Sequence, residues 1–77
     1  MVDDTMEMIR TQLTVARWHL DAAIGAAHDA ARSHHELARV AYHGVVRILA
    51  RASGLDADQR AQIEQELAML RSRLQLP

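Results

Sequence analysis

Apolar residues recur at alternating intervals of three and four along the first thirty residues, and this spacing constrains the fold more than any other feature. A 3-4 repeat places every member of the series on one side of an α-helix, and no stretch shows the two-residue alternation of a strand. We therefore predict an all-α protein with a single domain, residues 1–77, whose first helix spans about 5–32. The series consists of Met6, Ile9, Leu13, Ala16, Leu20, Ala23, Ala27 and Ala30.

Two further segments carry helical patterns. A broad apolar arc predicts a second helix over about 34–52, and Gly54 is expected to cap its end. A third helix is predicted over about 57–75. It is expected to begin after Asp56, because Asp56 and Gln59 have the three-residue spacing of a capping box. The chain thus predicts a small bundle of three helices.

The junction at residues 32–35 admits two interpretations. Ser33 and Glu36 also have capping-box spacing, which predicts that a new helix begins there. No Gly or Pro interrupts the chain, however, and the helical phase continues through His34 and Leu37. A continuous helix would make a long rod with the third helix folded back on it. We favour the break, because such a rod would greatly exceed the roughly dozen residues of an average helix.

The chain is short for a protein that folds alone. Fourteen of its 77 residues are alanine and none is cysteine, so the core is thin and no disulfide reinforces it. Chains of this size often gain the missing stability by oligomerisation. We therefore expect an antiparallel homodimer with a self-association seam formed by Leu13, Leu20, Ala27, Ile63, Leu67, Leu70 and Leu74.

The sequence predicts a cytoplasmic protein without membrane association. No apolar run approaches the roughly 20 residues of a membrane-spanning helix, and the acidic start Met-Val-Asp-Asp does not resemble a secretory signal. The absence of cysteine fits a reducing compartment. All nine basic residues are arginine, a bias typical of GC-rich bacterial or phage genomes.

Catalytic and metal-binding signatures are missing from the sequence. The five histidines are separated by 9, 6, 1 and 8 residues, and none has a His, Asp or Glu three or four positions away. Only those spacings place two ligands on one helix face. There is no cysteine nucleophile and no glycine-rich phosphate loop. We predict a non-enzymatic protein that uses neither a cofactor nor a metal.

Basic side chains are concentrated in the middle third of the chain. The predicted second helix would carry a basic strip, which is either a docking surface for an acidic partner or phosphate, or a solvated face partly screened by Glu36. A helix-turn-helix is not expected, because the third helix would bring acidic side chains to the nucleic-acid phosphates. The basic strip consists of Arg32, His35, Arg39, His43, Arg47 and Arg51.

A second apolar strip runs along the first helix, off the main series. It contains Met8, Val15, Trp18 and Ala22. Core packing under another helix is the favoured interpretation; if the strip is exposed, Trp18 marks a partner surface. We predict a protein–protein interaction module that self-associates and regulates, inhibits or escorts a larger protein partner. The alternative is a nucleic-acid-associated regulator that binds through the basic strip.

Overall fold

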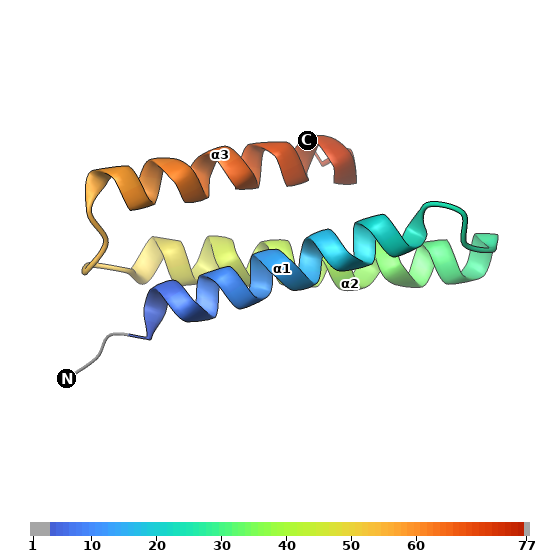
Figure 1. Ribbon diagram of the computed structural model, residues 1–77, viewed down its shortest axis with the longest axis horizontal. Helices are drawn as coiled ribbons and strands as arrows, with labels where there is room; N and C mark the ends of the chain where they lie inside the picture. Colours follow the sequence, from blue (N-terminus) through green and yellow to red (C-terminus); the bar gives the residue numbers. More distant parts are fainter. Residues whose placement is uncertain (1–3, 77) are drawn as a thin grey trace.

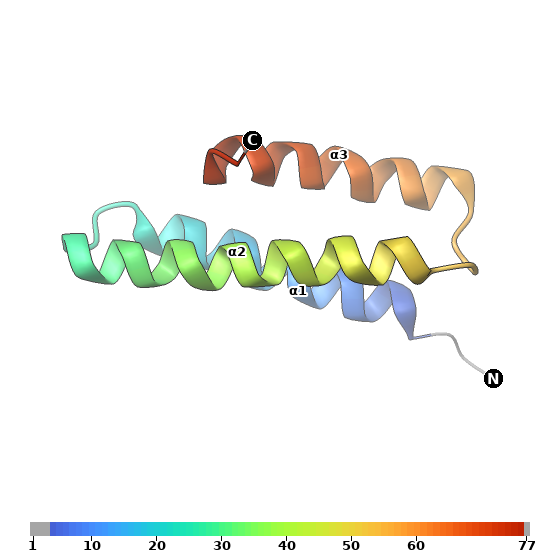
Figure 2. The same ribbon diagram turned by 180° about the vertical axis from the view of Figure 1, so that it is seen from behind.

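The computed structural model describes residues 4–76, and this part of the chain forms three α-helices and no strand (Figure 1). The helices are α1 (Thr5–Ala23), α2 (His28–Arg51) and α3 (Ala57–Leu74). α1 and α2 form an antiparallel hairpin, and α3 returns alongside it, as the view from behind also shows (Figure 2). The predicted all-α fold of three helices is therefore confirmed.

The turn between α1 and α2 occupies residues 24–27, and Gly25 makes it possible. Gly25 has a φ of +81°, a left-handed conformation that only glycine adopts without strain. Around it the backbone N–H of Ile24 donates to the carbonyl of Asp21, and that of Ala26 donates to Ala23, both at 3.2 Å. These bonds satisfy carbonyls at the end of α1, so the helix stops there.

The predicted break at residues 32–35 is wrong, and so is the alternative of a single long rod. α2 runs without interruption through Ser33, because α1 has already ended at the left-handed glycine. The Glu36 side chain bonds Arg39 at 2.6 Å instead of capping a helix start. Ala27 and Ala30, which the 3-4 series assigned to the first helix, are exposed in the turn and in the first turns of α2.

α2 ends at Arg51, and the capping residue is Ala52 rather than the predicted Gly54. Ala52 has an extended conformation, with φ −72° and ψ 130°. Carbonyl groups at the end of α2 accept hydrogen bonds from a side chain of α3. The Arg60 guanidinium donates to the carbonyl of Ala52 at 3.0 Å and to that of Leu49 at 3.5 Å. A cation at a helix C-terminus also opposes the partial negative charge of the helix dipole.

Both ends of α3 are well defined. The predicted capping box is confirmed: the Gln59 backbone N–H donates to the Asp56 carboxylate at 2.8 Å, and the Asp56 backbone N–H donates to the Gln59 side chain at 3.2 Å. At the other end, Gln75 is left-handed with φ 58°. The N–H groups of Gln75 and Leu76 bond carbonyls of the last helical turn, a Schellman motif. Pro77 lies outside the described residues.

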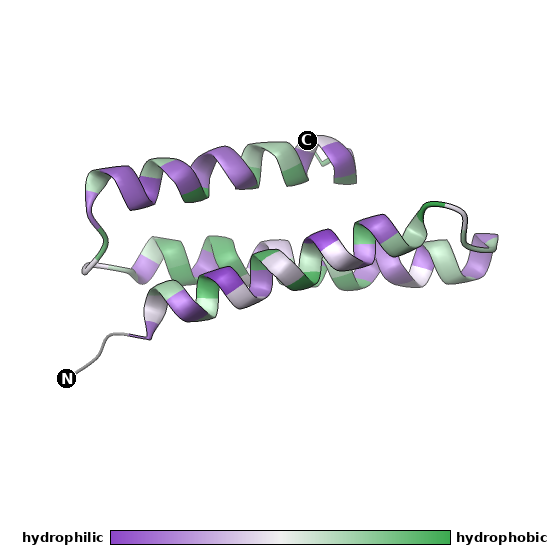
Figure 3. Cartoon of the chain, viewed as in Figure 1, coloured by the Kyte–Doolittle hydropathy of each residue, from purple (hydrophilic) through white to green (hydrophobic). Residues whose placement is uncertain are grey.

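The core lies between the three helices, and the contact between α1 and α2 is the most extensive. Small side chains such as Ala16, Ala38 and Ala41 are buried there and let the two helices approach closely. α3 packs more on α2 than on α1, and its ribbon is mostly hydrophilic (Figure 3). Its buried residues are the predicted apolar positions Ile63, Leu67 and Leu70.

Polar contacts fasten α3 to the hairpin at its surface. Arg17 of α1 pairs with Glu66 at 2.8 Å, and Asp21 of α1 pairs with Arg73 at 2.9 Å. From α2, the Tyr42 hydroxyl accepts a hydrogen bond from Arg71 at 3.4 Å, and this bond raises the pKa of Arg71. The two ion pairs are exposed, so each contributes at most about 1 kcal/mol.

Candidate interaction surfaces

The predicted self-association seam falls largely inside the core of one chain. Leu13 and Leu20 of α1 are buried against the same core as Ile63, Leu67 and Leu70 of α3, and Leu74 is half-buried beside them. In this fold these leucines contact residues of their own chain, and their role between two chains stays a prediction. The assignment of Ala27 to the seam is wrong, because Ala27 is exposed in the α1–α2 turn.

The second apolar strip of α1 is exposed except at Ala22, which is half-buried. The exposed fractions are 62% for Trp18, 53% for Met8 and 38% for Val15, so the favoured interpretation of this strip as core is wrong. Val15 lies two residues, or about 200° of helical rotation, from Arg17, which bonds α3. The strip therefore faces away from α3.

α2 extends this exposed apolar surface. The Trp18 ring lies 5.8 Å from the His34 ring of α2, edge to face, and Leu37 follows one turn after His34 with half of its surface exposed. Val40, also exposed, lies at its edge. We refer to Met8, Val15, Trp18 and Leu37 as the outer apolar face of the hairpin.

Two histidines meet beside Trp18. The Nδ1 atoms of His19 in α1 and His34 in α2 are 2.9 Å apart, and the Trp18 ring contacts both imidazoles edge to face. Spacings within one helix do not reveal this pair, because its two members belong to different helices. Recognition of Gly25 as the turn would have narrowed the search, because an antiparallel hairpin folded at residues 24–27 brings position 19 within about one helical turn of position 34.

The basic strip is exposed along α2, as predicted. Arg39 is neutralised in part by Glu36, which confirms the expected screening. Arg32, Arg47 and Arg51 form no ion pair with any residue in the described part of the chain. These three arginines are therefore free to bind an external anion.

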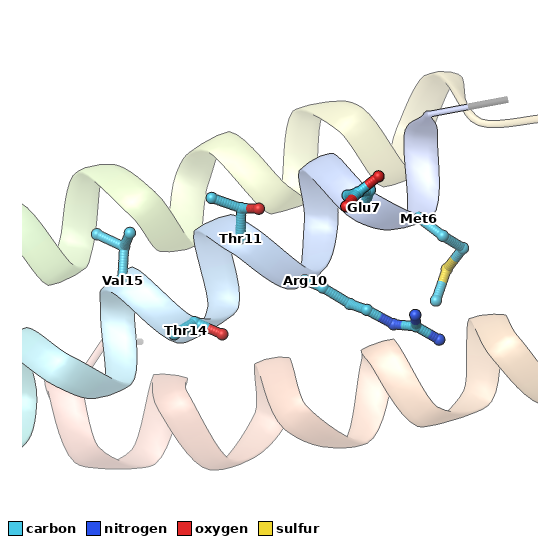
Figure 4. A pocket seen from close by; sticks show the side chains of 6 residues that line it. All are labelled: Met6, Glu7, Arg10, Thr11, Thr14 and Val15. Carbon is cyan, nitrogen blue, oxygen red and sulfur yellow. The ribbon is translucent and has the colours of Figure 1, made fainter. Parts of the chain in front are cut away.

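A shallow depression of about 520 Å³ lies on the surface of α1 (Figure 4). Its lining comes from this one helix and mixes an acid, a base and two threonines, so it is open and has no opposing wall. Substrate sites usually enclose most of a ligand between several elements. The lining residues are Met6, Glu7, Arg10, Thr11, Thr14 and Val15.

No three His, Asp or Glu side chains within residues 4–76 come close enough to hold a metal ion together. None of the three helices combines the length and the apolar character needed to cross a membrane.

The fold and its surfaces define a small three-helix bundle with one uncovered apolar face. No protein-family model matches the chain, and comparison with curated proteins and with solved structures finds no significant match.

Proposed function

We propose that this chain is a non-enzymatic protein-interaction module that self-associates through the outer apolar face of the hairpin. The observation that carries the proposal is the exposure of Trp18, Met8, Val15 and Leu37 on the side of the hairpin that α3 does not cover. Exposed aromatic and methionine side chains are enriched at protein interfaces.

A second copy of the chain is the occupant that we propose for this face. Alanines such as Ala16, Ala38 and Ala41 make up much of the core, so the core is thin, and small proteins often gain stability by oligomerisation. A two-fold dimer would bring the same face of each copy together, so that Trp18 of each copy packs near the centre.

The test compares two substitutions at equally exposed apolar positions. Trp18→Glu places a charge in the outer apolar face, and Met69→Glu places one on α3, outside that face. In sedimentation equilibrium at tens of micromolar, we expect the unaltered protein and Met69→Glu to be dimers and Trp18→Glu to be a folded monomer. A monomeric unaltered protein, or dissociation by Met69→Glu alone, would contradict the proposal.

A larger protein partner would bind the dimer through the basic strip, which self-association leaves uncovered. The free arginines Arg32, Arg47 and Arg51 favour an acidic surface, and such binding would weaken as salt is added. Regulation, inhibition or escort of that partner is the function that we assign to the module. A partner that binds equally well to the Arg47→Glu variant would contradict this use of the strip.

Nucleic acid is the second candidate for the basic strip. The favourable observation is that the unpaired arginines lie along one helix, so several phosphates of one strand are within reach. The strip lacks the interleaved aromatic rings that stack on unpaired bases. We expect binding no tighter than about micromolar at physiological salt. A nanomolar complex that Arg39→Ala and Arg47→Ala abolish would reverse the ranking of the two candidates.

A further inference from the structure

The imidazoles of His19 and His34 form a hydrogen bond between α1 and α2. Their Nδ1 atoms are 2.9 Å apart, whereas the ring centroids are 5.1 Å apart and the rings are tilted by 36°. The rings therefore meet nearly end to end, each directing its Nδ1 atom at the other. This is the geometry of an N–H···N bond. Two ligands of one metal ion would instead aim at a third point, and no third donor lies near them in the described chain.

The number of protons on the pair decides whether this bond exists. In the neutral pair, one ring carries its proton on Nδ1 and donates to the bare Nδ1 of the other. One added proton leaves one bare Nδ1, so the bond persists and becomes charge-assisted. A second added proton leaves two N–H groups face to face and two positive charges in contact. The first proton therefore preserves the contact and the second breaks it.

No charged neighbour offsets the second proton. One turn away, His19 has only Val15, Ala16, Ala22 and Ala23 around it, and His34 has only Ala30, Ala31, Leu37 and Ala38. The nearest charges on α1, Arg17 and Asp21, are bound to Glu66 and Arg73 of α3. On α2, Glu36 is paired with Arg39, while Arg32 and His35 are exposed and make no bond to the pair. The described chain thus supplies no carboxylate to either imidazole.

We propose that the His19–His34 pair is a proton-operated latch of the outer apolar face. When the pair binds its second proton, the two rings separate, the Trp18 ring loses the two imidazoles that it packs against, and self-association weakens. Histidine is the side chain that most often serves as a proton-operated switch in proteins, and in this pair the distance between the two Nδ1 atoms makes the contact depend on the number of bound protons. The effect on self-association rests on the function proposed above, whereas the latch itself rests on the geometry of a single chain.

The latch is tested first on the unaltered protein. Nitrogen-15 NMR of the imidazoles reports which ring nitrogen carries the proton. We expect one of the two rings to be an Nδ1–H tautomer at neutral pH, and the pair to take up its protons in two separate steps, because the two sites are coupled. Two Nε2–H rings with a single common step would overturn the proposal.

Trp18 provides the second measurement, since it is the only tryptophan in the chain. We expect its fluorescence to change in two steps as the pH falls in the unaltered protein, and in one step in His34→Ala. The matched control is His35→Ala, which removes an exposed histidine from the same helix and should keep both steps. Identical titrations of His34→Ala and the unaltered protein would contradict the latch.

Sedimentation at two pH values separates the latch from the self-association. We expect the dissociation constant of the dimer to rise about tenfold when the pH is lowered from about 7 to about 5, because a tenfold change corresponds to the loss of one hydrogen bond of ordinary strength. In His34→Ala the dissociation constant should not rise. A dimer whose dissociation constant ignores pH would overturn the regulatory role. A protein that is monomeric at both pH values, yet titrates in two steps, would refute the proposed self-association and leave the latch intact.

Discussion

The two faces of the α1–α2 hairpin both carry apolar side chains, but α3 covers only one of them. On the inner face, Leu13 and Leu49 are buried under α3 and its Leu67. On the outer face, Trp18 and Met8 have more than half of their surface exposed. The difference arises because, among the described residues, α3 is the helix that packs on the hairpin, and it covers one side only. An amphipathic pattern therefore predicts which residues favour burial, and the packing of the helices determines which of them are buried.

The largest expected effect comes from the inner face. Leu67→Ala leaves a cavity between α3 and the hairpin and should lower the free energy of unfolding by about 2–5 kcal/mol. Trp18→Ala, on the outer face, removes a larger side chain but should cost less, because most of the ring already contacts water. Urea unfolding at concentrations that keep the protein monomeric measures both. Equal losses would show that the two faces do not differ in the way described.

The clamp between Arg60 and the end of α2 should have the next largest effect. Arg60→Ala leaves the carbonyls of Leu49 and Ala52 without the guanidinium, and a hydrogen bond to a charged group is worth about 1.5–3 kcal/mol. Arg60→Lys keeps the charge near the helix end and should recover part of the loss. If Arg60→Ala leaves the free energy of unfolding unchanged, water forms equally good hydrogen bonds to these carbonyls, and apolar contact alone holds α3 on the inner face.

Gly25→Ala probes the turn that creates both faces. The added methyl group meets nothing within 4 Å, so the only cost is that of a left-handed alanine, roughly 1–2 kcal/mol. Gly44→Ala is the matched control. Gly44 lies within α2 and also has open space around it, so that substitution should stabilise the helix slightly. Thermal unfolding of the two variants should shift in opposite directions, and shifts in the same direction would contradict the assigned turn.

The smallest effect is expected at the rim of the inner face. Arg17→Ala breaks the ion pair with Glu66, which is exposed and should contribute no more than about 1 kcal/mol. The variant should become indistinguishable from the unaltered protein at high salt, because salt screens exposed charges. If the loss of stability in Arg17→Ala is the same at high salt, it comes from the packing of the aliphatic part of the arginine side chain and not from the ion pair.

The sequence predicted best where the determinants are local. Asp56 and Gln59 identified the start of α3, and the spacing of Ile63, Leu67 and Leu70 identified its buried side, because a capping box and a helical repeat each lie within a few turns. The turn at Gly25 was missed because Ser33 and Glu36 have the spacing of a helix start. The sequence offers both Gly25 and Ser33 as possible boundaries between the first two helices, and neither local pattern shows which one the chain uses. The His19–His34 pair depends on that turn, so it could not be found before the hairpin was known. The exposure of Trp18 depends on which side of the hairpin α3 covers, and the sequence of α3 does not reveal that side.

The two short connections, residues 24–27 and 52–56, also bear on the order in which the protein folds. They keep most contacts close in sequence, and proteins with such local topology fold in microseconds to milliseconds. The hairpin, with the more extensive contact, is expected to form first and α3 to dock on it last. α3 is then also the unit that detaches most readily from the folded protein, and its amide hydrogens should exchange with solvent sooner than those at the α1–α2 contact. During each such opening the inner face of the hairpin is exposed to solvent, so these brief openings would be the moments at which the protein is most vulnerable to proteolysis and aggregation.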